Sequence, residues 1–313
     1  DGRIITVSND YTPLSVGDTV YVSFGYEQYT QSEGYTVQEI DRIPSAIMLF
    51  VIFVVLYVLF AGWQGLRSIG ALLVSVAAIA FGLIPLVAAG YNPLLVGFVI
   101  SAGVLAAAIF ITHGIKTISF VSFIGCMISI AVTLLIALWA RDLLSITGMA
   151  ADTANSIRFL YNDQINLSDL LMAGVIIGIL GVLDDVAVMQ AAMTREFIRA
   201  KEKGASLLPV IKKSLAIGRE PSAALVNTLV LAYVGVSLPL FLIVLAPDVQ
   251  SLTGGAATLS MNLSSELFMV EFMRSVVGSL GLVLTVPVVT VLAAYFYNKF
   301  PPEGETTAYH HHH

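Results

Sequence analysis

Two adjacent carboxylates, Asp184 and Asp185, lie in the inner part of a membrane-length apolar segment that runs from Met172 to Met193. An Asp at the centre of a membrane helix costs roughly 2.5–3.5 kcal/mol on insertion scales, so such residues are rare and are usually functional. Carboxylates at this depth can bind and release a proton or a cation. We therefore treat this carboxylate pair as the candidate site of ion coupling.

A second polar pair, Asn227 and Thr228, lies about two turns inside the next apolar segment. The carboxylate pair precedes Arg195 by nine to ten residues, and Asn227 and Thr228 follow Arg219 by eight to nine. With a rise of about 1.5 Å per residue, both pairs reach similar depths, roughly 10–15 Å from the cytoplasmic edge. We expect Asn227 and Thr228 to complete the ion site by hydrogen bonding, and Arg219 and Glu220 to orient its cytoplasmic entrance.

Glycines mark one face of the helix that carries the carboxylate pair. Gly174, Gly178 and Gly181 share this face, and Asp185 continues it four residues after Gly181. Small residues let a second helix approach closely, so a polar group on the same face lies against protein rather than lipid. We therefore expect Gly178 and Gly181 to pack against a neighbouring helix, and Asp185 to be the interior carboxylate. The alternative is a packing groove in which one Asp is hydrogen-bonded to Asn227.

Two further polar positions have simpler interpretations. Glu271 and Arg274 are three residues apart near the outer end of the last apolar segment, a spacing that predicts an intrahelical ion pair with a supporting role. His113 lies at the inner end of an apolar segment and is interpreted as a boundary residue. The chain has one cysteine, Cys126, inside an apolar segment, so no metal site, cofactor or thiol catalysis is expected.

The composition identifies the class of protein. Of the 313 residues, 57% are hydrophobic and only 12% are charged, and the mean hydropathy is +0.88. Soluble domains of this size do not have such a composition, so we predict an all-α polytopic membrane protein. Because each hydrocarbon crossing needs about 20 helical residues, the pattern predicts seven transmembrane helices, at 45–62, 69–89, 93–112, 117–140, 168–193, 221–246 and 267–297.

The charges between these segments predict the orientation of the chain. Seven Lys or Arg residues lie between the fifth and sixth segments, whereas the alternate loops contain a mixture of acidic and basic residues. Excess Lys and Arg marks the cytoplasmic side. We expect a bacterial inner-membrane protein with its N-terminus outside and its C-terminus in the cytoplasm. Two loops, 140–167 and 194–220, contain enough apolar residues to predict interfacial helices on the outer and inner surfaces respectively.

The first 44 residues differ from the rest. Arg3 to Ser8, Thr19 to Phe24 and Tyr35 to Ile40 are rich in β-branched and aromatic residues, which predicts short strands. So few residues cannot bury an independent core. We interpret residues 1–44 as an extracytoplasmic β segment, the remnant of a small β domain, followed by the transmembrane domain 45–300. The tail 301–313 ends in a histidine run typical of a purification tag.

Several motifs along the chain resemble those of the YibE/F-like membrane proteins. They include the run from Gly178 through Asp184 and Asp185, Ile217-Gly218-Arg219-Glu220, and Asn227-Thr228 followed by Leu-Val-Leu-Ala-Tyr233. The resemblance covers roughly residues 16–297, and also includes His113-Gly114, the run from Glu271 to Arg274, Gly278-Ser-Leu-Gly281 and Val286-Pro287. The last three segments are also similar, more weakly, to SecD/SecF export proteins and RND transporters, in which intramembrane acidic residues are linked to proton movement.

These observations predict a proton- or cation-coupled membrane transporter or a protein-export accessory, without enzymatic activity. The expected partners are membrane lipid and another membrane protein, with no nucleic acid. The alternative is a membrane scaffold that binds a partner through its glycine-lined face and transports nothing. A remote alternative is an intramembrane aspartyl protease, because Gly181-x-x-Asp184 loosely resembles the Gly-x-Gly-Asp run of those enzymes. That chemistry needs carboxylates from two helices, and no second helix offers one at the right depth.

Overall fold

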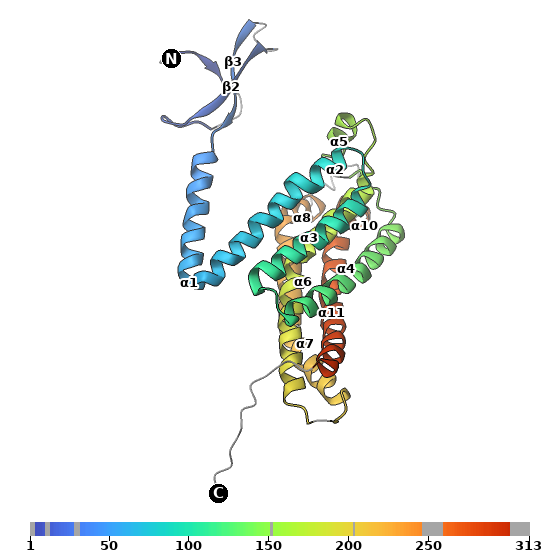
Figure 1. The fold of residues 1–313 in the computed structure, drawn as a ribbon. Coiled ribbons are helices and arrows are strands. Elements are labelled where there is room, and N and C mark those ends of the chain that lie inside the picture. Colours follow the sequence, from blue (N-terminus) through green and yellow to red (C-terminus); the bar gives the residue numbers. More distant parts are fainter. Residues whose placement is uncertain are drawn as a thin grey trace. The chain divides into compact units, whose positions relative to one another are not determined.

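The computed structural model describes residues 4–9, 13–27, 32–150, 153–202, 204–245 and 259–300, and the chain divides into two compact units, 1–66 and 67–313 (Figure 1). The boundary falls inside one long helix, α1 (Ile43–Ala78), just after a kink at Gly62. Gly62 has φ 59° and ψ −141°, a conformation that suits glycine because it has no Cβ atom. The first unit therefore contains the expected β segment together with α1 up to Leu66, and the predicted tail 301–313 lies outside the described residues.

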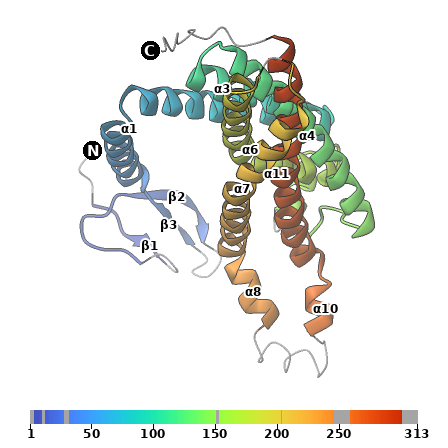
Figure 2. The same ribbon diagram turned by 90° about the horizontal axis from the view of Figure 1, so that it is seen from below.

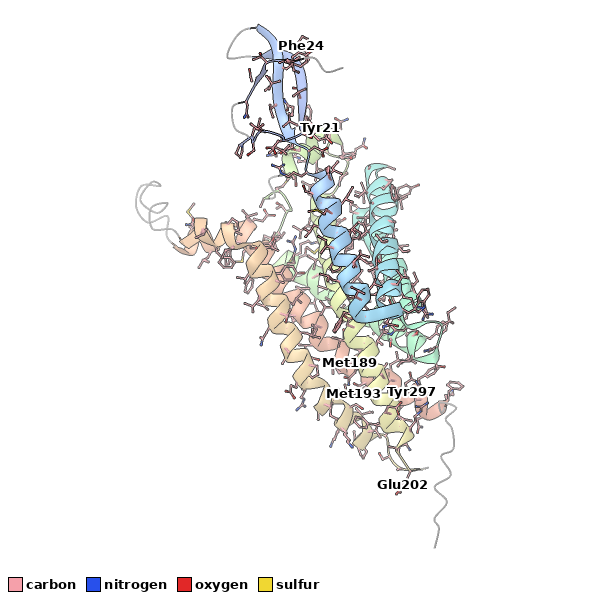
Figure 3. All side chains as sticks on the ribbon, turned by 90° about the vertical axis from the view of Figure 1, so that its left-hand side faces the viewer. Tyr21, Phe24, Met189, Met193, Glu202 and Tyr297 are labelled. Carbon is pink, nitrogen blue, oxygen red and sulfur yellow. The ribbon has the colours of Figure 1, made fainter. Side chains whose placement is uncertain are left out.

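The first unit contains a three-stranded sheet of β1 (Val7–Ser8), β2 (Val20–Glu27) and β3 (Ser32–Ile40), in the order β1-β3-β2. Strands β2 and β3 pair antiparallel, and β1 pairs parallel with β3. Figure 3 labels Tyr21 and Phe24 on β2. Among the sheet residues whose side chains are described, Val37 alone is buried. The second and third predicted strands are confirmed, the first is limited to Val7–Ser8 among the described residues, and the sheet has almost no core of its own.

The second unit is helical, and three of its described helices, α3, α6 and α11, begin with side-chain caps. Asn92 accepts a hydrogen bond from the backbone N–H of Leu95, and Ser265 accepts one from Phe268. These caps satisfy backbone donors that have no partner inside a helix. After α1 the helices are η1 (a π-helix, Ile79–Leu83), α2 (Ile84–Ala88), α3 (Pro93–His113), α4 (Thr117–Leu143), α5 (Ala154–Leu160), α6 (Leu167–Arg199), α7 (Leu208–Val236), α8 (Leu238–Leu245), α10 (Leu259–Leu263) and α11 (Glu266–Lys299).

Five helical stretches in the described part of the chain are long and apolar enough to cross a membrane, compared with seven predicted segments. The first two predicted segments, 45–62 and 69–89, form one continuous stretch, Ile43–Ala88, kinked at Gly62. The sixth, 221–246, is divided between the last part of α7 and α8 by a break at Ser237, and neither helix is among the five. The count of seven crossings therefore stays a prediction, whereas a multi-pass helical architecture is supported.

The two predicted loop helices have different outcomes. A helix, α5, does form within 140–167. The residues that predicted a helix within 194–220 are also helical, but they form the first part of α7, which begins at Leu208 and continues to Val236. Leu207, Ile211 and Leu215 pack against the helical core, so the apolar face of this stretch continues directly into α7.

Helix α6 lies at the centre of the second unit, where it packs against α3, α4, α7 and α11 (Figures 1 and 2). We call the end where α6 ends and α7 begins the basic end, because Arg195, Arg199, Lys212 and Lys213 lie there. The opposite end, where α6 and α11 begin, is called the distal end. At the distal end the Asp169 carboxylate accepts hydrogen bonds from Asn92 of α3 at 2.9 Å and Arg141 of α4 at 3.3 Å, which ties three helices together.

Candidate functional site

The two carboxylates of α6 have different surroundings, and their assignment from the sequence is reversed. Asp184 is half-buried, on the side of α6 that faces Cys126 of α4, whereas Asp185 is exposed within the chain. The backbone N–H of Asp185 donates to Oδ1 of Asp184 at 3.0 Å. Successive helical residues point about 100° apart, so only one member of the pair can follow the buried face. The prediction that Asp185 is the interior carboxylate is wrong, and Asp184 takes that place.

The glycine face of α6 is open rather than packed. Gly174, Gly178 and Gly181 are all exposed within the chain. A Cβ atom on Gly174 or Gly181 would meet nothing within 4 Å, and one on Gly178 would meet only the hydroxyl of Tyr233, at 3.2 Å. The predicted packing of Gly181 against a neighbouring helix is therefore wrong. We call this surface, which consists of Gly174, Gly178, Gly181 and Asp185, the open face of α6.

Other glycines make the close helix contacts. A Cβ atom on Gly97 of α3 would lie 2.6 Å from Ala173, and one on Gly125 of α4 would lie 2.7 Å from Val289. On α11, a Cβ atom on Gly281 would lie 2.7 Å from the hydroxyl oxygen of Thr133. These contacts bring α3, α4, α6 and α11 together at small residues, as is common in membrane helix packing.

His113 is the basic neighbour of the open face. It ends α3 at the basic end, is half-buried, and lies close enough to Asp185 for the two side chains to interact electrostatically. The sequence interpretation of His113 as a boundary residue missed this relationship. A histidine can carry a proton near neutral pH. In the described ranges, no group of three His, Cys, Asp or Glu side chains could hold a metal ion.

Asn227 and Thr228 are at the expected depth but on a different face. Gly178 is level with Tyr233 and Gln190 is level with Gly218, so residues 184–185 lie within about a turn of 227–228 along the axis. Both Asn227 and Thr228 are nevertheless exposed, and the Thr228 hydroxyl donates to the carbonyl of Ala224 on its own helix. Within the described residues no hydrogen bond joins them to the carboxylate pair. Helix α7 is buried instead along a different set of residues, namely Val210, Ser214, Gly218, Ser222 and Leu229.

Gln190 forms a buried polar junction that the sequence analysis did not single out. Its side chain is fully buried, and its Nε2 donates to the backbone carbonyl of Ser214 at 3.0 Å and to the hydroxyl of Thr290 at 2.6 Å. It therefore joins α6 to α7 and α11 about one and a half turns from the carboxylate pair. The signal in the sequence was a single amide inside an apolar run, but its partners belong to other helices.

Arg219 and Glu220 follow this junction directly. Both are exposed on α7, next to Gly218, which lies against the Gln190 side chain. On α11, near its C-terminal end, Tyr297 lies at the basic end of the helices (Figure 3). Arg195 and Arg199 of α6 interact electrostatically with its hydroxyl. Arg219 and Glu220 thus lie beside a buried polar junction, and their role at an entrance stays a prediction.

The predicted pair of Glu271 and Arg274 on α11 is confirmed. Arg274 Nη1 donates to Glu271 Oε1 at 2.6 Å, and both side chains are largely buried. The other carboxylate oxygen of Glu271, Oε2, is buried without a hydrogen-bond partner. This pair lies near the distal end of α11, far along the helix from the Gln190 junction.

The comparisons with known proteins identify a family for this chain. The sequence model of the YibE/F-like protein family matches residues 49–299. No curated protein sequence and no solved structure matches the chain. The matched range includes the open face of α6, the Gln190 junction and the Glu271–Arg274 pair. The chain therefore belongs to the YibE/F-like protein family.

Proposed function

We propose that this protein couples proton movement to transport, or to protein export, across the bacterial inner membrane. Asp184 and Asp185 would carry the proton, and His113 would exchange it with Asp185 at the basic end, which we assign to the cytoplasm. The observation that carries the proposal is the carboxylate pair itself. It lies within a helix long and apolar enough to cross a membrane, and no Lys or Arg in the described part of the chain forms an ion pair with it.

An unpaired carboxylate is costly in a membrane, which supports a functional role. Structural acidic groups elsewhere in this protein have partners: Asp169 contacts Arg141, and Glu271 contacts Arg274. Asp185 has only the titratable His113 as a charged neighbour of opposite sign. A carboxylate beside a histidine can give up and regain a proton without leaving a permanent charge in the membrane. Asn227 and Thr228 are outside this group because they face away from it.

The experiment that tests this function is proton flux into proteoliposomes that contain the purified full-length protein. An imposed pH gradient should dissipate faster than in protein-free liposomes of the same lipid. A rate equal to that of protein-free liposomes, with or without a membrane potential to drive the proton, would contradict the proposal.

The open face of α6 favours a second candidate function, that of a membrane scaffold. A strip of glycines that contacts almost nothing in its own chain is a surface on which another membrane helix can pack closely. Replacing Gly181 with Leu would block that approach without disturbing the rest of the fold, because the site of the new side chain is empty. A scaffold predicts that Gly181→Leu prevents the co-purification of a partner, and that the wild-type protein carries no proton flux.

A further inference from the structure

A groove between α7 and α11 lies apart from the carboxylate pair and is not used by the proposed function. It has a volume of about 430 Å³ and is lined by side chains from α7, α8 and α11. Its walls are almost entirely apolar, with Val226 and Val230 on α7 facing Val276 and Leu280 on α11. Ligand pockets in proteins commonly have volumes of about 300–1,000 Å³, so this groove can accept part of a small amphiphile.

The dimensions of the groove match one leaflet of a bilayer. Along α11 the lining runs from Phe268 to Val283, which is fifteen residue steps or about 22 Å at 1.5 Å per residue, and the part that extends inward from Glu271 covers twelve steps, about 18 Å. The hydrocarbon core of a bilayer is about 30 Å thick, so one leaflet occupies about 15 Å. Because Glu271 lies in the second turn of α11, the groove extends from the distal end of the helices toward the middle of the membrane.

Glu271, at the distal end of the groove, indicates the chemistry of the headgroup that a bound amphiphile would have. Glu271 uses Oε1 to accept from Arg274, and its Oε2 is buried without a partner. A buried carboxylate oxygen needs a hydrogen-bond donor, and a charged donor is the most favourable. Arg274 retains donors beyond the one that contacts Glu271. Glu271 lines the groove and therefore complements an ammonium N–H, whereas Arg274 does not line it and supplies a positive charge beside Glu271 that favours a zwitterionic head.

We infer that this groove binds a phospholipid with a primary amine headgroup, phosphatidylethanolamine, from the leaflet at the distal end. One acyl chain lies between the valines of α7 and α11, and the ammonium group donates to Oε2 of Glu271. Phosphatidylcholine has the same chains and phosphate, but its quaternary ammonium has no N–H to donate. The two lipids therefore differ in the one interaction that the unpartnered oxygen requires.

Native mass spectrometry of the full-length protein in detergent tests this inference, with dioleoyl phosphatidylethanolamine and dioleoyl phosphatidylcholine as the probes. A hydrogen bond to a charged group predicts about tenfold tighter binding of the ethanolamine lipid. Glu271→Gln should reduce its affinity to that of the choline lipid. Val276→Trp should remove binding by filling the groove, and Val291→Trp is the matched control. Both valines are on α11 and are similarly exposed, at 39% and 41%, but Val291 does not line the groove.

Three results would overturn the inference. Equal affinity of the two lipids for the wild-type protein would exclude recognition of the amine. Wild-type binding by Val276→Trp would place the lipid elsewhere, and equal loss in Val276→Trp and Val291→Trp would mean that binding is nonspecific. Val276→Trp leaves the Glu271–Arg274 pair intact, so the test does not depend on the stability of the Glu271→Gln variant.

Discussion

A Cβ atom placed on Gly218 of α7 would lie 2.4 Å from the Oε1 atom of Gln190 on α6, a distance that no real side chain could tolerate. Glycine at this position therefore allows α7 to approach the fully buried Gln190 side chain. The same approach lets Gln190 donate to the carbonyl of Ser214, one turn earlier on α7. The contact explains in physical terms why a glycine lies beside Arg219 and Glu220 in this chain.

Gly218→Ala should destabilise the protein by about 1–3 kcal/mol, because overpacking a close contact displaces backbone or side chains. The matched control is Gly235→Ala on the same helix, where a Cβ atom would meet nothing within 4 Å. That variant should be neutral or up to about 1 kcal/mol more stable, since alanine favours helix. Thermal unfolding in detergent measures both. Equal melting temperatures for the two variants would show that α7 can move away from Gln190 at no cost.

Gln190 and Thr290 should be energetically coupled. Gln190→Met keeps the size of the side chain but removes the donor to Thr290 and Ser214, and Thr290→Val removes one acceptor. Each single variant should lose about 1–3 kcal/mol of unfolding free energy. The double variant should be more stable than the sum of the two losses predicts, by about 0.5–3 kcal/mol, because the shared bond is lost only once. A double-mutant cycle of unfolding free energies measures the coupling, and strict additivity would contradict it.

Asp169→Asn should loosen the distal end of the helices. Asp169 is 9% exposed, and its carboxylate accepts from Asn92 and Arg141. Removing its charge weakens the hydrogen bond from the Arg141 guanidinium at this junction. We expect the free energy of unfolding to fall by about 1–3 kcal/mol. Asp142→Asn is the control, because the Asp142 side chain is 70% exposed although it also contacts Arg141. Exposed pairs contribute little. A larger loss of unfolding free energy for Asp142→Asn than for Asp169→Asn would show that the contacts of Asp169 do not hold the helices together.

The sequence was sufficient for the strands and for the membrane-length helices, because alternation and apolar length are local properties of the chain. It predicted the pair of Glu271 and Arg274 for the same reason, since their spacing of three residues places both on one helix face. The predicted number of crossings differs from the structure because the first two segments form one kinked stretch and the sixth is divided between α7 and α8.

The arrangement of the candidate site depended on tertiary packing, which the sequence does not report. A glycine strip is compatible with a packed face or an open one, because glycine adds no apolar side chain that would show which face is buried. The helix core is instead formed by the opposite face of α6, which includes Ile179, Leu183 and Val186. Gln190 and His113 gained their importance from residues on other helices, so neither could be identified from its position in one segment.

The central claim is that Asp185 carries the proton, and the proton flux of one variant tests it most directly. Asp185→Asn retains the shape of the side chain and cannot ionise, so its flux into proteoliposomes under an imposed pH gradient should fall to that of protein-free liposomes. Glu196→Gln is the control, because it also removes one acidic charge from α6 but at an exposed position beside Arg199. That control should retain wild-type flux. Unchanged flux in Asp185→Asn, in a preparation whose wild-type protein conducts protons, would contradict the account.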